Sequence, residues 1–418
     1  MQTALADFIR DTPQGREANE ILRSCVHCGF CLPACPTYQL LGDELDSPRG
    51  RIYQIKQLLE GAPVSARTQL HLDRCLTCRA CESACPSGVQ YARLLDIGRA
   101  VSEPRLPRTP RARLTRYLLH KVVPHTRRVR ALLGLARALR GVLPRALRAR
   151  LPAAAAPLPA VLKARRPHWP APRHARRVVL LEGCVQPALA ADINPATAQL
   201  LDRIGISALR ASACGCCGML DHHLTEHAAA LTAMRRNVDA LWPHVEAGVE
   251  AIVLTASACA SMVADYGRLL RDEPDYAERA LRISALTRDV SQLLAGEGAA
   301  LGAALLPAAG VRVAFQSPCS LQHALKVRGV VEGLLSTAGF TLTPVADGQR
   351  CCGSAGSYSL LQPQLSGELL RMKVQALEAG RPDVIATANI GCLVHLRGGT
   401  SVPVCHWVQL LAARLADG

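Results

Sequence analysis

The chain has 418 residues, of which 49% are apolar and 20% charged, and this composition supports two to three folded domains and excludes global disorder. It contains 18 cysteines, a number that needs a chemical explanation. Residues 1–10 lack the features of a secretory signal, and no apolar run reaches the roughly 18 residues that a membrane-spanning helix needs. We therefore expect a cytoplasmic protein whose cysteines bind metal or carry redox chemistry rather than form structural disulfides.

The first predicted domain, residues 1–105, contains the same cysteine run twice. The runs CVHCGFCLPACP at 25–36 and CLTCRACESACP at 75–86 both match C-x2-C-x2-C-x3-C-P, the pattern of bacterial two-cluster ferredoxins. In that pattern, three cysteines of a run bind one 4Fe–4S cluster and the fourth binds the other. Structural zinc is a poorer fit, because zinc sites use two separated pairs of ligands. The spacing predicts cluster 1 on Cys25, Cys28, Cys31 and Cys85, and cluster 2 on Cys75, Cys78, Cys81 and Cys35.

The second predicted segment, residues 106–175, is strongly basic. Residues 101–180 hold 20 Lys and Arg and one acid, a charge of +19, whereas the rest of the chain carries −3. Apolar residues recur at helical spacing between arginines, and Pro124 and Pro144 are expected to divide the segment into short amphipathic helices. Residues 152–172, rich in Ala and Pro, are typical of a linker. The apolar positions are Leu132, Leu135, Leu139 and Val142.

The basic segment indicates an anionic partner, and its residue pattern narrows the choice. Tyr117 and Trp169 are its only aromatic residues, so it lacks a platform on which nucleic-acid bases stack, and we expect no nucleic acid. Leu and Arg at helical spacing are typical of a helix on a membrane surface or in a partner's groove. The alternative is a helix pair that packs on its own protein with solvated charges.

Four β-rich runs in the C-terminal half each lead into a cysteine. They span 176–184, 251–259, 311–319 and 383–392, and helical stretches such as 222–245 and 364–379 lie between them. Strands that alternate with helices predict mostly parallel α/β sheets, in two domains at 176–305 and 306–418. The four cysteines are then expected at the carboxyl ends of strands, the edge where α/β sheets bind ligands.

These cysteines belong to a second repeat with an offset of 135 residues, or 133 for its last member. Each half supplies a strand-end cysteine, a Cys-Cys-Gly turn and a last cysteine. The spacing leaves open whether they hold a third cluster, a redox disulfide or only buried thiols. Cys214 and Cys405 have no counterpart and are expected to be structural, and His222, His223 and His323 are secondary candidates. The first set is Cys184, Cys216, Cys217 and Cys259, and the second set is Cys319, Cys351, Cys352 and Cys392.

The predicted fold is a helical two-cluster ferredoxin domain, a basic helical linker and a duplicated α/β Cys-Cys-Gly domain. This order resembles the iron–sulfur subunits of bacterial glycolate oxidases (glycolate dehydrogenases), and DSPRGRIYQIK at 46–56 and PCSLQHALK at 318–326 are similar to that family in particular. Subunits of anaerobic glycerol-3-phosphate dehydrogenase and thiol–disulfide reductases related to heterodisulfide reductase are the alternatives. In the latter each repeat ends in C-x2-C, whereas Met262 and His395 stand at those positions here.

The resemblance implies an electron-transfer role. FAD on partner subunits oxidises glycolate to glyoxylate, or D-lactate to pyruvate, and this chain passes the electrons towards a quinone-type acceptor from the inner face of the cytoplasmic membrane. No residue of this chain is expected to act on the substrate. Gly296, Gly298 and Gly302 are too weak a pattern for a nucleotide site, which agrees with a flavin on another chain.

Overall fold

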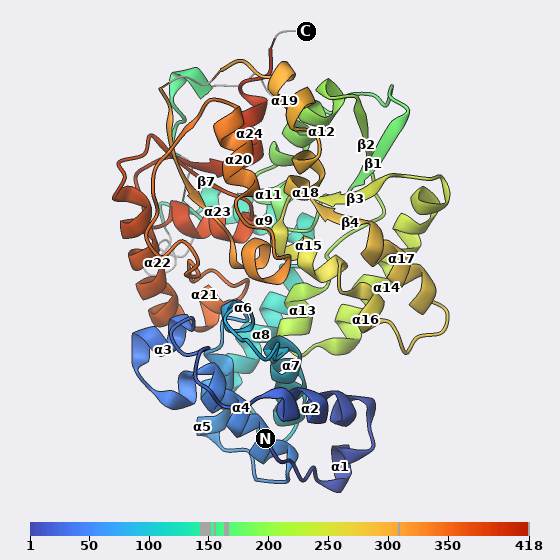
Figure 1. Ribbon diagram of the computed structural model, residues 1–418, viewed down its shortest axis with the longest axis vertical. Helices are drawn as coiled ribbons and strands as arrows, with labels where there is room; N and C mark the ends of the chain where they lie inside the picture. Colours follow the sequence, from blue (N-terminus) through green and yellow to red (C-terminus); the bar gives the residue numbers. More distant parts are fainter. Residues whose placement is uncertain (143–151, 154–155, 163–166, 308–309, 417–418) are drawn as a thin grey trace.

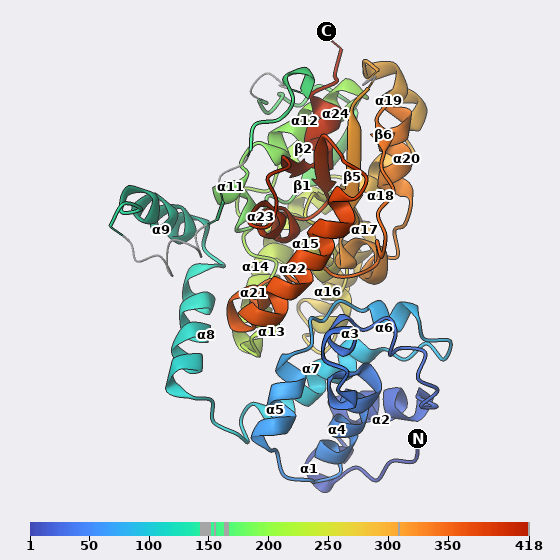
Figure 2. The same ribbon diagram turned by 90° about the vertical axis from the view of Figure 1, so that its left-hand side faces the viewer.

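The computed structural model describes residues 1–142, 152–153, 156–162, 167–307 and 310–416. The N-terminal helices form one end of the molecule and two α/β halves form the other (Figure 1). The described helices of the basic segment lie along one side between them (Figure 2). There α8 (Pro110–Val122) and α9 (Thr126–Ala138) stand away from the main body (Figure 2).

The N-terminal domain consists of short helices, and α2 (Pro13–Ser24) and α4 (Pro48–Leu59) begin at side-chain caps. Thr12 and Ser47 each accept a hydrogen bond from the backbone N–H three residues later, and a proline follows each cap at the first helical position. Leu22 and Ile55 are fully buried in the core that these helices enclose. The elements are α1 (Asp7–Arg10), α2 (Pro13–Ser24), α3 (Pro36–Leu41), the 3-10 helix η1 (Glu44–Asp46), α4 (Pro48–Leu59), α5 (Ala66–Asp73), α6 (Ala80–Ser83) and α7 (Tyr91–Ser102).

Helices α4 and α7 cross closely at Gly98. A Cβ atom at this position would lie 2.7 Å from Cγ1 of Ile55, so a larger residue would push the two helices apart. The crossing matters for the cysteines, because α4 carries Arg51 and α7 begins at Tyr91, and both side chains line the hollow that Cys75 also lines.

The basic segment is anchored at several points. Arg108 makes ion pairs with Asp73 and Glu103, and His120 Nδ1 lies 2.9 Å from Asp221 Oδ1 in the first α/β half. A 3-10 helix, η2 (Ala160–Leu162), buries Leu162 in the C-terminal core. The predicted break at Pro124 is confirmed, whereas Pro144 lies outside the described residues.

The C-terminal half contains two parallel sheets of four strands each. Their strand orders are β2-β1-β3-β4 and β6-β5-β7-β8. In the first sheet Val178 pairs with Ala208 on one side and Ala251 on the other. The strands are β1 (Arg176–Leu180), β2 (Ile206–Arg210), β3 (Ala251–Leu254), β4 (Thr287–Asp289), β5 (Arg312–Gln316), β6 (Thr341–Leu342), β7 (Val384–Thr387) and β8 (Val404–His406).

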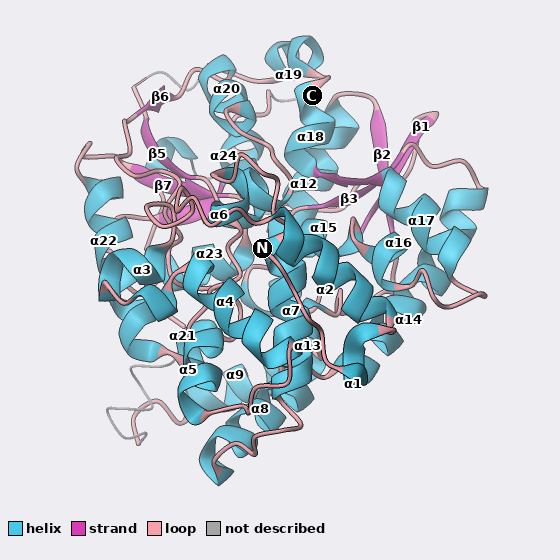
Figure 3. Cartoon of the chain, turned by 60° about the horizontal axis from the view of Figure 1, so that its bottom comes forward, coloured by secondary structure: helices cyan, strands magenta, loops and turns pink. Residues whose placement is uncertain are grey.

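Successive side chains along each strand point to opposite faces of the sheet, so they enter different cores. Val178 and Val313 face one core shared by both halves. Val179 faces the core of the first half, whereas Ala314 faces a core of the second half to which Ala190, Ile193 and Ala256 of the first half also contribute. The helices α12, α18, α20 and α24 fill the shared core between the sheets (Figure 3). The first half has α11 (Gln186–Leu189), α12 (Ile193–Arg203), α13 (Met219–His223), α14 (His227–Glu246), α15 (Ser257–Val263), α16 (Tyr266–Leu269), α17 (Ala277–Leu286), α18 (Val290–Ala295) and α19 (Gly298–Ala304). The second has the π-helical turn η3 (Ser320–Ala324), α20 (Val330–Thr337), α21 (Tyr358–Leu361), α22 (Pro363–Glu378), α23 (Ile390–Arg397) and α24 (Trp407–Ala412).

The predicted fold class is confirmed, and the four β-rich runs form β1, β3, β5 and β7. The other four strands were not expected from the sequence. The expected domain limits after residues 105, 175 and 305 each fall between two elements. None of the described helices is both long enough and apolar enough to cross a membrane.

Candidate metal centres

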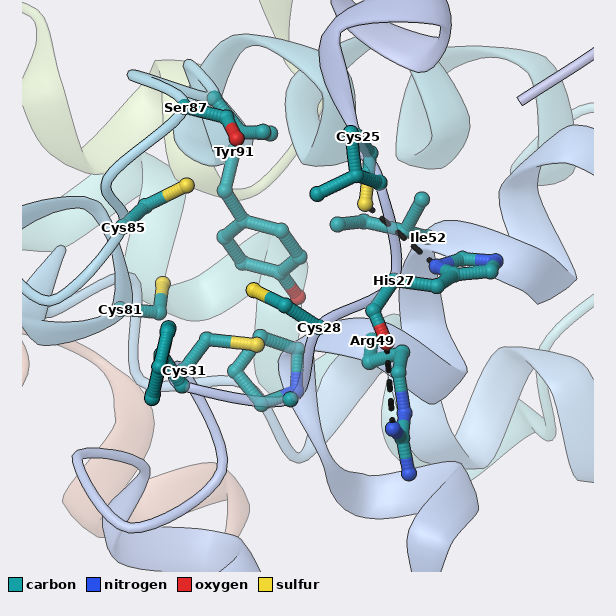
Figure 4. A pocket seen from close by; sticks show the side chains of 15 residues that line it. Cys25, His27, Cys28, Cys31, Arg49, Ile52, Cys81, Cys85, Ser87 and Tyr91 are labelled. Atoms are coloured by element: carbon teal, nitrogen blue, oxygen red, sulfur yellow. Dashed lines mark hydrogen bonds between the residues drawn. The ribbon is translucent and has the colours of Figure 1, made fainter.

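The four cysteines assigned to cluster 1 line one hollow of about 430 Å³. Cys25 directly follows α2, Cys28 and Cys31 come from the loop after it, and Cys85 comes from the second run. In Figure 4 these side chains stand around Tyr91, and Cys25 Sγ lies 3.4 Å from His27 Nδ1. Cys28 is exposed, and neighbouring Phe30 is 64% exposed, so this site opens to the surface.

The four cysteines assigned to cluster 2 line a second hollow of about 360 Å³. Cys35 reaches it from the first run and joins Cys75, Cys78 and Cys81, while Cys81 also lines the first hollow. The Tyr91 hydroxyl donates to Cys75 Sγ at 3.6 Å. The structure therefore brings together the two sets that the crossed pattern predicts. That these sets hold iron stays a prediction.

The backbone of both loops repeats together with the cysteines. His27 and Thr77, two residues after the first cysteine of each run, have φ angles of 57° and 54°. Gly29 and Arg79, two residues further on, have φ angles of 86° and 60°. A left-handed conformation at a β-branched residue such as Thr77 is strained, and strain of this kind occurs mainly at functional sites. The loops are held in a shape that turns the cysteines inward.

The linings of both hollows fit an anionic cluster. Among the described lining residues there are arginines but no carboxylate. Burial raises the pKa of the Cys31 thiol to about 11 and raises the pKa values of Cys78 and Cys81 well above their usual range. Thiolates at these positions are unfavourable without a cation, and a bound metal deprotonates its thiols outright. The residues present therefore fit iron–sulfur clusters.

The first Cys-Cys-Gly set also converges. Cys184 and Cys217 donate hydrogen bonds to Cys216, which holds the pKa of Cys216 well below its usual range, and Cys217 also contacts Cys259. This set lies beside the start of α9, where the Thr126 hydroxyl donates to the Cys184 carbonyl at 2.6 Å.

The second set forms a continuous row of sulfur contacts, from Cys319 through Cys351 and Cys352 to Cys392. Contacts with neighbouring thiols, followed by burial, leave the pKa values of Cys319, Cys351 and Cys352 well above their usual range. The side-chain amide of Asn389 donates to Cys392 Sγ at 3.6 Å. Each set thus brings four thiols close together, and the occupant stays open.

Both Cys-Cys-Gly turns need their glycine. Gly218 and Gly353 have φ angles of 86° and 92°, and a Cβ atom at Gly353 would lie 2.6 Å from the Ser366 carbonyl oxygen. Only glycine satisfies both the left-handed backbone and the close approach. At the positions where heterodisulfide reductase relatives carry a last cysteine, Met262 is buried and His395 Nε2 lies 3.2 Å from the Ser366 hydroxyl.

The second set lies directly against cluster 2's loop. Leu76, Cys351, Tyr358 and Leu369 form one buried apolar group, and Cys78 and Cys319 pack against it. The Tyr358 hydroxyl donates to the Arg74 carbonyl at 3.1 Å. No sequence signal indicated this contact, because it joins residues about 280 positions apart.

The secondary candidates have structural partners. His222 Nε2 lies 3.1 Å from Asp96 in α7, and burial lowers the pKa of His223 to about 4. His323 Nδ1 lies 2.9 Å from the Ser83 hydroxyl. These histidines lie where the α/β halves meet the ferredoxin-type domain. Cys405 is buried in β8, in the shared core, in agreement with a structural role.

Comparisons with known proteins agree with this geometry. A family model described as "4Fe-4S dicluster domain" matches residues 21–89, and one described as "Cysteine-rich domain" matches residues 178–264 and 313–397. The chain is 49% identical over 415 residues to the glycolate oxidase iron-sulfur subunit of Escherichia coli (strain K12), across 99% of each chain. It is 32% identical over 400 residues to the probable glycolate oxidase iron-sulfur subunit of Bacillus subtilis (strain 168), across 90% of this chain and 89% of that one. Lactate utilization protein A of Geobacillus thermodenitrificans (strain NG80-2) is 26% identical over 246 residues, which are 57% of this chain and 99% of that one.

A two-cluster ferredoxin-type domain joined to a duplicated cysteine-rich α/β domain defines an iron–sulfur electron-transfer subunit. Within that class, the chain belongs to the family of glycolate oxidase iron–sulfur subunits. The resemblance inferred from the order of motifs is confirmed.

Proposed function

We propose that this chain carries electrons within a glycolate dehydrogenase, from FAD on partner subunits to a quinone-type acceptor. The observation that carries the proposal is the spatial order of the cysteine sets, from the surface of the protein to its interior. Cluster 1's site opens to solvent at Cys28, cluster 2's site lies behind it, and the second Cys-Cys-Gly set packs on cluster 2's loop. The relatives named above favour glycolate, with D-lactate as a second substrate, over glycerol 3-phosphate or a disulfide.

The glycine pattern at 296–302 does not have the surroundings of a nucleotide site. Gly296 caps the end of α18 and Gly298 begins α19, so a helix rather than a strand precedes them. A dinucleotide fingerprint needs a strand directly before its glycine-rich turn. This supports placing the flavin and the substrate on partner subunits.

The clusters, when bound, supply one-electron carriers between a two-electron flavin and the acceptor. The cysteine thiolates that line the two hollows would hold the clusters. Buried Tyr91 lies between both hollows and donates to Cys75, a type of contact that tunes a cluster without taking part in the chemistry.

The proposal that the partner subunits oxidise glycolate, and that this chain only transfers electrons, is directly testable. The purified chain alone is expected to show no flavin absorbance and no glycolate-dependent dye reduction, because it lacks the group that accepts hydride from substrate. Addition of the flavin-bearing subunits is expected to restore dye reduction. Glycolate turnover by the isolated chain would contradict the proposal.

We also propose that the second Cys-Cys-Gly set holds a third redox centre. Its four sulfurs form a continuous row of contacts, and Cys319 and Cys351 lie close enough to Cys78 for their charges to interact. An occupant at this position is the nearest acceptor for electrons that leave cluster 2. The first set has no such contact with a ferredoxin-type cysteine among the interactions of the described residues.

We further propose that the basic helices α8 and α9 attach the chain to an anionic membrane surface. In α8 the exposed apolar residues Leu114 and Leu118 lie one turn apart, and in α9 Leu132 and Leu135 are 50% and 56% exposed. Helix α9 has no buried residue, which argues against the alternative that it only packs on its own protein. Each basic side chain at an anionic surface contributes about 1 kcal/mol, screened within about 8 Å at physiological salt.

Exchange of Leu132 and Leu135 for Ser is expected to weaken binding to anionic vesicles, because it removes the apolar contact and keeps the charge. Co-sedimentation with anionic and neutral vesicles, at low and high salt, measures this. The matched control is Leu281→Ser, a comparably exposed leucine in α17. Equal weak pelleting with both lipids would remove the membrane role.

A further inference from the structure

Residues 46–56 contain a buried charge pair whose role the electron-transfer proposal does not explain. Asp46 and Arg51 are both fully buried, and Arg51 Nη2 donates to Asp46 Oδ1 at 3.1 Å. Arg74 also pairs with Asp46, at 2.8 Å. Burial of charges is costly, and apolar residues often replace such pairs without loss of stability. Stability alone therefore does not explain why Asp46 and Arg51 are buried as a charged pair.

Arg51 is directed at the cysteine of cluster 2 that comes from the other run. Its Nη1 lies 3.9 Å from Cys35 Sγ and donates to the Thr37 hydroxyl at 3.1 Å, while Nε donates to the His71 carbonyl at 2.7 Å. These contacts fix the guanidinium on the wall of the hollow, among the residues that line it.

Among the described residues that line cluster 1's hollow, no equivalent cation is buried. Arg49, two residues earlier in the same segment, lines cluster 1's hollow, but its side chain is 35% exposed and pairs with Glu44 at 2.8 Å. Water and Glu44 therefore screen its charge. Arg51 acts in a medium of low effective dielectric constant, where the same charge interacts several times more strongly.

Reduction adds a negative charge to a cluster, and a fixed neighbouring cation stabilises that charge. Asp46 opposes this effect, but it shares its charge with Arg51 and Arg74, so the three side chains together carry +1. Arg51 stays protonated throughout, so no proton has to move. Transfer of one electron from cluster 1 to cluster 2 oxidises the first by one electron and reduces the second by one.

We propose that Arg51 raises the reduction potential of the cluster on Cys35, Cys75, Cys78 and Cys81, and so makes cluster 2 the electron-accepting member of the pair. Arg51 is thus a positioning and tuning residue rather than a ligand. The inference rests on the proposed function, since it requires both clusters.

The test is a redox titration of the anaerobically purified full chain, followed by electron paramagnetic resonance. In Arg51→Gln the ratio of reduced to oxidised cluster 2 at a fixed potential is expected to fall about tenfold, which is about 59 mV for one electron. Arg51→Lys keeps the charge and is expected to restore most of the ratio. Asp46→Asn is expected to shift the ratio in the opposite direction.

Arg49→Gln is the matched control, because it removes the same charge from the same segment and should leave cluster 2 unchanged. Equal shifts in Arg51→Gln and Arg51→Lys, or no shift in either, would overturn the inference. If the Arg51→Gln chain does not assemble cluster 2, the direction of the shift in Asp46→Asn decides. A lower ratio of reduced to oxidised cluster 2 in Asp46→Asn would then overturn the inference. Absence of either cluster from the native chain would overturn the proposed function as well, whereas two clusters with unshifted potentials would overturn only the inference.

Discussion

Cys85→Ser is expected to remove cluster 1, although Cys85 belongs to the run that supplies cluster 2. The reason is geometric: Cys85 lines the hollow of Cys25, Cys28 and Cys31, and its charge acts on the Cys25 and Cys31 thiols. Iron in the ferredoxin-type domain should fall from about eight to about four atoms per chain. Electron transfer from the flavin subunits should be lost, because the surface-facing cluster is missing.

Two further variants make this result specific. Cys35→Ser is expected to give the reciprocal loss of cluster 2, since Cys35 lines the other hollow. Cys214→Ser is the control, because burial dominates the raised pKa of this thiol and no other cysteine acts on it. Iron analysis with electron paramagnetic resonance distinguishes the clusters. Loss of the cluster that neighbours Cys85 in sequence, with cluster 1 intact, would refute the crossed assignment.

The cysteine patterns allowed the sites to be predicted because their spacing is set by local geometry. A loop that places Cys25, Cys28 and Cys31 around one hollow needs that spacing, and the repeated φ angles at His27 and Thr77 are a local property of both runs. The Cys-Cys-Gly turns are similar, since the close approach at Gly353 excludes a side chain. Strands β1, β3, β5 and β7 were predictable because each is a β-rich run before a cysteine.

The missed features depend on tertiary contacts. Strands β6 and β8 have two and three residues and form only because β5 and β7 lie beside them. The roles of Arg51 and Tyr358 follow from burial and from contacts across domains, which spacing does not encode. The apolar spacing in the basic segment was visible, but only the structure shows that Leu132 and Leu135 face solvent instead of a core.

The two halves of the C-terminal domain offer a matched pair of variants. Cys351→Ser changes the second set, which contacts Cys78, and Cys216→Ser changes the equivalent residue of the first set, beside α9. Cys351→Ser is expected to stop discharge of reduced cluster 2, because it removes the nearest acceptor. Cys216→Ser is expected to leave that first step intact, since none of the contacts described for the first set involves a ferredoxin-type cysteine.

The measurement is rapid freeze-quench electron paramagnetic resonance of the reduced complex after mixing with a quinone analogue. Cluster 2 should stay reduced in Cys351→Ser, and it should be reoxidised in Cys216→Ser even if the later steps are slow. Because Cys351 is buried, Cys319→Ser provides a second variant at a more accessible position of the same set. Equal behaviour of the Cys351 and Cys216 variants would mean that proximity to Cys78 does not decide the route, and the third centre would then have to be sought outside the second set.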